Sequence, residues 1–149
     1  MKNPKNYSAQ ELFLLLNETS ECNWLEAKGK HDTFNSKSGK DDYRSLLESV
    51  CSFSNEPNLG GGIILLGVGE NKKGLGEQFE IEGLEDPDKA QTDIATQCKS
   101  VFNIPVYPEI SLERINNKTV LKIWVPELSV SKKPLYFAKR AYHQELSVA

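Results

Sequence analysis

Apolar residues recur at helical spacing in three parts of the chain. Before the first of these, Ser8-Ala9-Gln10-Glu11 has the residues of a capping box, so a helix is expected over about 9–18. A second helix is expected over about 41–54, and a third from Pro87, because proline favours the first helical position. The buried stripes of these two helices are expected to be Tyr43, Leu46, Leu47, Val50 and Cys51, and Ala90, Ile94, Cys98 and Val101.

Between these helices the pattern changes to that of β-strands. Residues 23–28 alternate, which places Trp24, Glu26 and Lys28 on one side of a strand. The run 63–66 is apolar on both faces and predicts a central strand that is covered on both sides. Further strands are expected at 79–84, at 107–115 and 119–125 as a hairpin, and at 134–137, whereas the polar stretch 29–40 predicts a mobile loop.

The order of these elements predicts a single domain over residues 1–149. Its expected class is α/β (α+β), with a mixed sheet of about five to six strands packed with three helices. No apolar run is long enough to span a membrane, and the N-terminus lacks the apolar stretch of a signal peptide, so we expect a cytoplasmic protein with no membrane partner. The three cysteines are far apart, which argues against a zinc site or a disulfide framework.

Glycine-rich loops can bind phosphate, and Gly60-Gly61-Gly62 raises that possibility. In a P-loop or a Rossmann loop the order is strand, glycines, helix, whereas here a predicted helix comes first and a strand follows. The chain also lacks the lysine and serine that follow the glycines of a P-loop. We therefore expect the glycines to end the helix and to let the next strand pack closely, with Gly67 and Gly69 marking a bulge or another close approach.

The motifs along the chain, taken together, are similar to those of a known family. They are L-E-A-K, then S-F-S-N, G-G-G, I-I-L-L and G-V-G-E, and later F-E-I-E-G-L, V-L-K-I-W-V-P and P-L-Y-F. This series resembles the Schlafen AlbA_2 domain over about residues 21–137. The resemblance implies an AlbA_2-like fold and a DNA- or RNA-binding domain of the kind found in bacterial transcriptional regulators and in Schlafen proteins. Two departures from the family pattern are the longer spacing at 56–59 and the residues after Ala141-Tyr142.

The same resemblance implies a candidate acidic site. Some Schlafen proteins cut RNA with a metal ion that is held by two acids five residues apart and a third acid after the G-V strand. Glu21, Glu26 and Glu70 have this arrangement, and oxygen ligands suit Mg²⁺ or Mn²⁺. An odd separation places Glu21 and Glu26 on opposite faces of a regular strand. For the three acids to converge on one metal ion, Glu21 must therefore precede the strand or follow a bulge. The alternative is that all three are solvent-facing acids.

Three functions remain open at this point. The first is a nucleic-acid-binding module, although the net charge of −3 and the pI of about 5.5 give no overall electrostatic case for it. Local basic groups would then hold the phosphate backbone, and Trp24 would either stack on a base or pack in the core. The second is a metal-dependent endoribonuclease, and the third an ATP-linked role, which the missing P-loop residues disfavour. The candidate binding residues are Lys28, Lys30, Lys40, Arg44, Lys132 and Lys133, with further basic residues at 37–44 and at Lys139 and Arg140.

Overall fold

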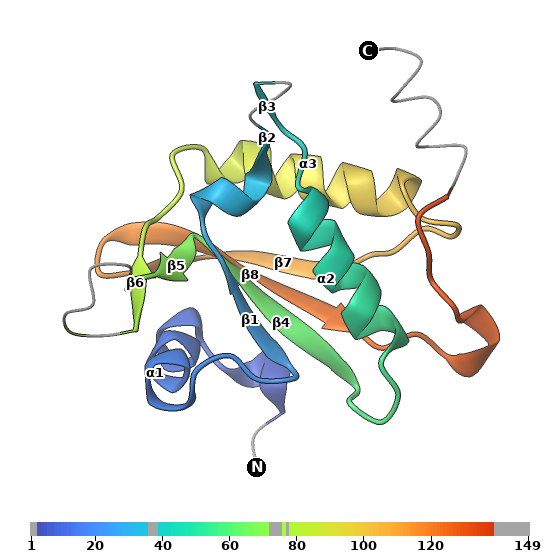
Figure 1. Cartoon of the computed structure of the whole chain (residues 1–149), viewed down its shortest axis with the longest axis horizontal. Coiled ribbons are helices and arrows are strands. Elements are labelled where there is room, and N and C mark those ends of the chain that lie inside the picture. The colour runs from blue at the N-terminus through green and yellow to red at the C-terminus, as the bar shows by residue number, and fades with distance from the viewer. Residues whose placement is uncertain (1–2, 36–38, 72–75, 77, 139–149) are drawn as a thin grey trace.

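A computed structural model describes residues 3–35, 39–71, 76 and 78–138, although not the side chains of Phe34, Asn35 and Lys40 (Figure 1). Within this part the chain forms three α-helices and three short 3₁₀ helices. The α-helices are α1 (Ala9–Thr19), α2 (Arg44–Asn55) and α3 (Pro87–Ser100), and the 3₁₀ helices are η1 (Pro4–Asn6), η2 (Lys30–Thr33) and η3 (Val130–Lys132).

The main sheet has four strands in the order β1-β4-β8-β7. Its strands are β1 (Leu25–Lys28), β4 (Gly61–Leu66), β8 (Lys118–Pro126) and β7 (Glu109–Ile115). Because β1 is parallel to β4 while the other pairs are antiparallel, the sheet is mixed. The predicted α/β class with three helices around a mixed sheet is therefore confirmed, although this sheet has four strands and not the expected five to six, because β5 and β6 pair separately.

The remaining strands lie outside the main sheet, in two antiparallel pairs. They are β2 (Phe34–Asn35) with β3 (Lys40–Asp41), and β5 (Val68–Glu70) with β6 (Phe79–Ile81). The prediction of a loop over 29–40 was wrong, because η2 and the β2–β3 pair occupy most of it. The predicted strand at 134–137 was also wrong, since only Phe137 makes an isolated bridge, to Phe102.

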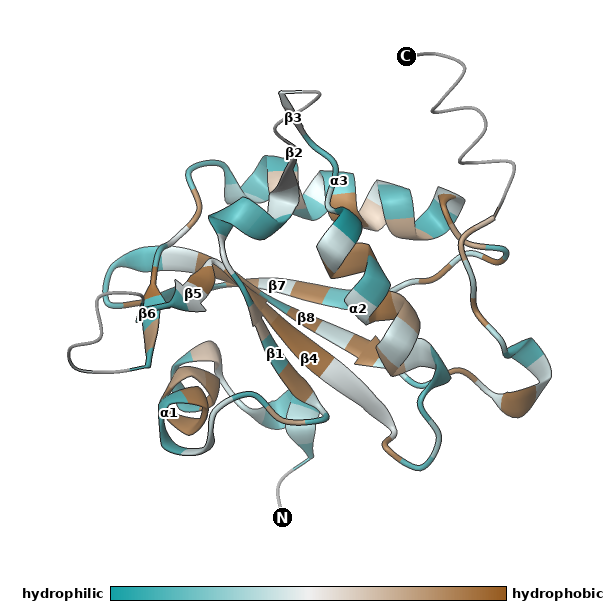
Figure 2. Ribbon diagram, viewed as in Figure 1, coloured by the Kyte–Doolittle hydropathy of each residue, from teal (hydrophilic) through white to brown (hydrophobic). Residues whose placement is uncertain are grey.

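Helices cover both faces of the main sheet (Figures 1 and 2). On one face, α1 packs over a cluster that includes Leu25, Ile63 and Leu65. On the other face, α2 and α3 pack over a cluster that includes Ile64 and Leu66. All six residues of β4 are buried, which confirms the prediction of a central strand covered on both sides. No helix in the described part of the chain has the length and apolar character to cross a bilayer.

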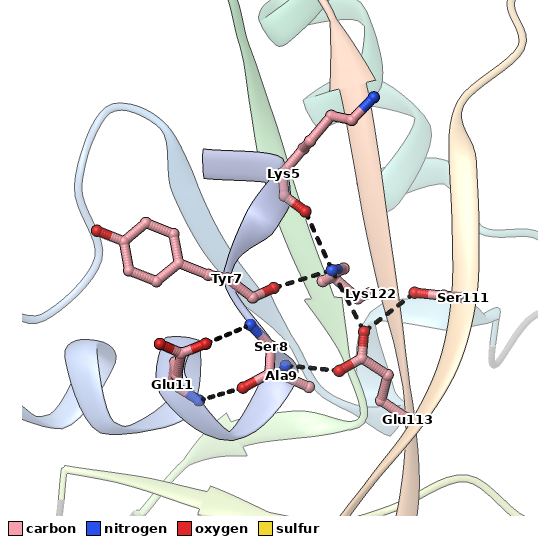
Figure 3. Close-up of polar contacts among 8 residues, drawn as sticks. All are labelled: Lys5, Tyr7, Ser8, Ala9, Glu11, Ser111, Glu113 and Lys122. Atoms are coloured by element: carbon pink, nitrogen blue, oxygen red, sulfur yellow. Dashed lines mark hydrogen bonds and ion pairs between the residues drawn. The ribbon is translucent and has the colours of Figure 1, made fainter. Parts of the chain in front are cut away.

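The start of α1 is fixed to the sheet by polar contacts (Figure 3). The predicted capping box is present, because Ser8 Oγ accepts from Glu11 N at 3.1 Å and Glu11 Oε1 accepts from Ser8 N at 2.9 Å. Glu113 on β7 then accepts from Ala9 N at 2.7 Å, and Lys122 on β8 donates to Tyr7 O at 2.9 Å. These contacts hold the helix N-terminus against β7 and β8.

The glycines after α2 permit close packing and do not end the helix. Helix α2 ends at Asn55 and its C-cap is Glu56 in an extended conformation, so the prediction of a glycine helix stop was wrong. A Cβ atom on Gly62 would overlap the ring of Phe53, and Gly61 has a φ of 123° beside the backbone of β8. The glycines therefore let β4 approach its neighbours, as the second part of the prediction stated.

Candidate functional site

The end of β1 carries an ion pair that faces α2. Lys28 Nζ lies 2.8 Å from Glu26 Oε1 and donates to Ser45 Oγ at 2.9 Å. Glu26 and Lys28 are registered opposite Ile64 and Leu66, whose side chains lie in the cluster under α2 and α3. The Lys28 side chain is only 12% exposed, so β1 fixes the position of its ammonium group. The predicted shared face of Glu26 and Lys28 is confirmed.

The first turn of α2 lies beside this ammonium group. Its N-cap, Tyr43, has a φ of 54° and makes no side-chain hydrogen bond to the helix. A left-handed conformation is uncommon for a bulky residue, and it explains why α2 begins later than the predicted position 41. The first N–H groups of a helix have no intrahelical partner and carry the positive end of its dipole. Lys28, Ser45 and this helix end therefore form a compact group of hydrogen-bond donors, in which Arg44 N already donates to Asp42 Oδ1 at 3.1 Å.

Glu21 lies before β1, as its odd separation from Glu26 requires. Its Oε2 accepts a hydrogen bond of 2.9 Å from Ala27 N, so the side chain folds back along the outer edge of the strand. Ile63 N donates to Trp24 O and Gly67 N donates to Lys28 O, so the even-numbered residues of this segment direct their backbone groups to β4. Because these directions alternate along a strand, Ala27 N points outward. In this position Glu21 satisfies an edge amide whether or not it has a further role.

The other two predicted carboxylates contribute to the raised pKa of Glu21. Partial burial is the largest cause that raises the pKa of Glu21 above its ordinary value, and the hydrogen bond from Ala27 opposes this shift. The negative charges of Glu26 and Glu70 raise the same pKa further, while Lys28 lowers it. Glu70, at the exposed end of β5, thus lies within electrostatic reach of Glu21. Within the described residues, however, no group of three or more His, Cys, Asp or Glu side chains is arranged to hold a metal ion.

The predicted basic residues fall into two groups at opposite ends of α2. Lys30 in η2 is exposed and lies two residues after Lys28. Arg44 begins α2, but its Nε lies 3.2 Å from Glu48 Oε1 and its guanidinium lies over the Phe137 ring, 5.0 Å from the centroid. Lys132 and Lys133 instead follow Leu128, whose N–H bonds Ser54 O in the last turn of α2. Lys133 is paired with Glu127 at 2.6 Å. The structure therefore does not bring these two groups together (Figure 1).

Some predicted residues lie elsewhere or outside the described part. Trp24 precedes β1 and stacks on Tyr7 with a centroid distance of 5.9 Å, and it packs against the cluster under α1. The expectation that it shares the face of Glu26 and Lys28 was wrong, because the regular strand begins one residue later. Lys40 lies in β3, but its side chain is not described, and Lys37, Lys139 and Arg140 fall outside the described residues.

Two residues beside Lys28 and Lys30 were not predicted from the sequence. One is Ser45, which accepts a hydrogen bond from Lys28. This contact depends on how β1 and α2 pack, and no pattern in the sequence indicates it. The other is Glu82, whose Oε1 accepts from Lys30 N at 2.7 Å. A Cβ atom on Gly29 would lie 2.7 Å from Glu82 Oε1, and one on Gly69 would lie 2.5 Å from Oε2. Both glycines thus make room for a carboxylate, and they were the available signal of its close approach.

Comparisons with known proteins agree with this architecture. The model of the family described as Schlafen, AlbA_2 matches residues 21–145. Among solved structures, the N-terminal domain of an ATP-dependent DNA helicase RecG-related protein from Nitrosomonas europaea has a TM-score of 0.74 and 40% identity. That match covers 89% of this chain and 82% of that one.

A protein from Corynebacterium diphtheriae is more distant, with a TM-score of 0.48 and 21% identity over 76% of this chain and 19% of that one. No curated protein sequence is significantly similar to the chain. The family match alone covers most of the chain, including β1, α2 and the main sheet. The chain therefore belongs to the Schlafen AlbA_2 family.

Proposed function

We propose that this domain binds nucleic acid by holding a backbone phosphate at the first turn of α2. The observation that carries the proposal is the fixed position of the Lys28 ammonium group beside Ser45. Family membership supports it, and so does the similarity to a domain of a DNA helicase-related protein. Phosphate contacts of this kind position a nucleic acid without reading its sequence.

The donors at this point suit a single phosphate group. An ammonium group has three N–H donors, and Glu26 and Ser45 account for two of them in the structure. The third N–H and the Ser45 hydroxyl can donate to phosphate oxygens, and the helix N-terminus favours an anion, although the first amide of α2, Arg44 N, already donates to Asp42 Oδ1 at 3.1 Å. Lys30 adds positive charge nearby, whereas Arg44 is paired with Glu48 and the net charge of −3 provides no long-range attraction. We therefore expect few phosphate contacts and a modest salt dependence.

The test is a fluorescence-anisotropy titration with single- and double-stranded DNA and RNA over a series of salt concentrations. The informative variant is the double substitution Glu26→Gln with Lys28→Met, which removes the pair without leaving one charge unpaired. Its affinity should fall at least about tenfold, and the slope of log K against log salt should become shallower by about 1. Thermal unfolding of the variant shows whether the fold is kept.

Glu127→Gln with Lys133→Met is the matched control, because it also removes one ion pair without changing the net charge, at the opposite end of α2. The proposed site predicts that this control binds as the unaltered chain does. Equal losses in the two proteins would place binding elsewhere, and no binding to any of the four nucleic acids would refute the function itself.

One observation favours metal-dependent RNA cleavage as a second candidate. Glu26 and Glu70 raise the pKa of Glu21, so three carboxylates share one neighbourhood, although they do not form a ready cation site in the described residues. RNA cleavage that requires Mn²⁺ and is lost in Glu70→Gln would support this candidate. Glu80→Gln is the control, because this exposed acid lies on the neighbouring strand β6. Equal activity in both variants would indicate a contaminating nuclease.

A further inference from the structure

Strand β7 forms an edge of the main sheet, and its hairpin shows which backbone groups point outward. Asn116 and Asn117 join β7 to β8, and their φ values of 50° and 68° are those of a type I′ turn. In such a two-residue turn the flanking pair, Ile115 and Lys118, exchanges hydrogen bonds with each other. By alternation the odd-numbered residues of β7 face β8, and the even-numbered residues direct their N–H and C=O groups outward.

The outward-facing residues are Ile110, Leu112 and Arg114. Among the described strands none pairs with this side of β7. Gln91 on α3 donates to Ile110 O at 3.4 Å, which confirms that this carbonyl points outward. The contact with Gln91 covers only one end of the edge. At the centre, Leu112 is 39% exposed and is one of five large apolar side chains that the described part exposes. This edge is long, exposes a leucine and contains no proline or bulge, so its free N–H and C=O groups can pair with another strand.

The charge pattern of β7 selects one register for pairing with itself. A twofold axis perpendicular to the sheet must place residues of the same face opposite one another. Centred on Leu112, this pairing sets Leu112 opposite Leu112, Ile110 opposite Arg114, and Ser111 opposite Glu113. No like charges then face each other.

The two adjacent symmetric registers are disfavoured. Centring on Ser111 sets Glu109 opposite Glu113, and centring on Glu113 sets this residue opposite itself. Like charges directly opposite destabilise a strand pair. In the register centred on Leu112, outward-facing N–H and C=O groups lie opposite each other and can form hydrogen bonds. They do so between the two Leu112 residues and in both Ile110–Arg114 pairs.

We propose that the outer edge of β7 is a dimerisation surface, where a second copy of this chain adds its own β7 in antiparallel orientation centred on Leu112. The two main sheets then become one continuous sheet. The surface is self-complementary in its backbone pattern and in its central apolar residue, and this register sets no like charges opposite each other. This inference does not depend on nucleic-acid binding or on the acidic residues.

The test measures the mass of the full 149-residue chain by sedimentation at increasing protein concentration. The unaltered chain should show a reversible monomer–dimer equilibrium. Leu112→Lys sets two positive charges opposite each other at the twofold axis, and should raise the dissociation constant at least about tenfold. Leu14→Lys is the matched control, because Leu14 is an exposed leucine on α1, and it should dimerise as the unaltered chain does.

A cross-linking experiment tests the register even if Leu112→Lys folds poorly. In a Cys22→Ser background, Leu112→Cys should form a disulfide-linked dimer on mild oxidation, because paired residues at a twofold axis lie within disulfide reach. Leu14→Cys in the same background should form no disulfide-linked dimer. A chain that is monomeric at every concentration, or equal cross-linking of the two cysteine variants, would overturn the proposal.

Discussion

The two edges of the main sheet differ in how their outward backbone groups are satisfied. At β1, four residues long, Ala27 N donates to Glu21 Oε2 and Leu25 N donates to Cys22 O, so the preceding chain closes the edge. At β7, seven residues long, the described residues provide only the contact of Gln91 with Ile110 O. An edge that its own chain closes cannot accept another strand, whereas an open edge can.

This difference separates two proposed roles in space. The closed edge lies beside Lys28 and the first turn of α2, where ionic side chains replace strand pairing. The open edge lies three strands away, across β4 and β8. If two copies pair through β7, both β1 edges lie at the outer ends of the joined sheet. The proposed dimer would therefore leave both proposed phosphate sites accessible.

The largest expected effect tests whether the two edges belong to one cooperative unit. Ile64 is fully buried in β4, between β1 and β8, and Ile64→Ala should lower the free energy of unfolding by about 2–5 kcal/mol, because it leaves a cavity. Urea unfolding measures the loss. Amide exchange should show that β1 and β7 lose protection equally. If β7 kept its protection while β1 lost it, the edges would be separate units.

The next largest expected effect is a loss of stability at β7, the open edge, where polar contacts hold the N-terminus of α1. Lys122 Nζ contacts Tyr7 O at 2.9 Å and Glu113 Oε2 at 3.3 Å, with its side chain 15% exposed. Because Lys122 Nζ also donates to Lys5 O at 3.3 Å, Lys122→Met leaves two carbonyls and a carboxylate without this partner, and should cost about 1–3 kcal/mol in thermal unfolding. Lys5→Met is the control, because Lys5 and Glu109 are exposed and 3.6 Å apart, and it should cost less than about 1 kcal/mol. Equal costs would show that the buried contacts are not the cause.

The sequence predicted the parts of the fold that depend on local pattern. The capping box at Ser8, the doubly covered strand at 63–66 and the hairpin across Asn116 all follow from residue spacing or turn chemistry, and the structure confirms them. The helix stop at the glycines was wrong because α2 ends before Glu56, and close packing against Phe53 explains Gly62 instead. A tertiary contact of this kind leaves no distinctive periodicity in the sequence.

The candidate site was only partly predictable for the same reason. Glu26 and Lys28 share a strand face by alternation, so their proximity followed from the sequence. Ser45 comes from a different element, and its contact with Lys28 depends on how α2 packs on the sheet. Lys132 and Lys133 looked equivalent to the other basic residues, but only the fold shows that they lie at the opposite end of α2.

A smaller effect tests the closure of the β1 edge. Glu21→Ala removes the acceptor of the Ala27 amide and should cost about 0.5–1.5 kcal/mol, with faster exchange of that amide measured by NMR. Glu21→Gln retains a carbonyl oxygen at the same place and should keep most of the protection. If both variants exchanged equally fast, the charge of Glu21 rather than its hydrogen bond would close the edge.

The smallest expected effect is on the titration of Glu21 itself. Its pKa is raised mainly by partial burial and further by the charges of Glu26 and Glu70, so the folded state binds this proton more tightly than the unfolded state. The free energy of unfolding should therefore fall as pH rises from the ordinary glutamate pKa to the raised value, and the contribution of Glu21 should be constant above it. A carbon-13 NMR titration of the carboxyl group measures the pKa directly. Glu26→Gln should lower it, yet leave it above the ordinary value because burial remains. An unchanged pKa in this variant would mean that the two carboxylates do not interact, and the closed edge would then be a hydrogen-bonded cap without a shared acidic site.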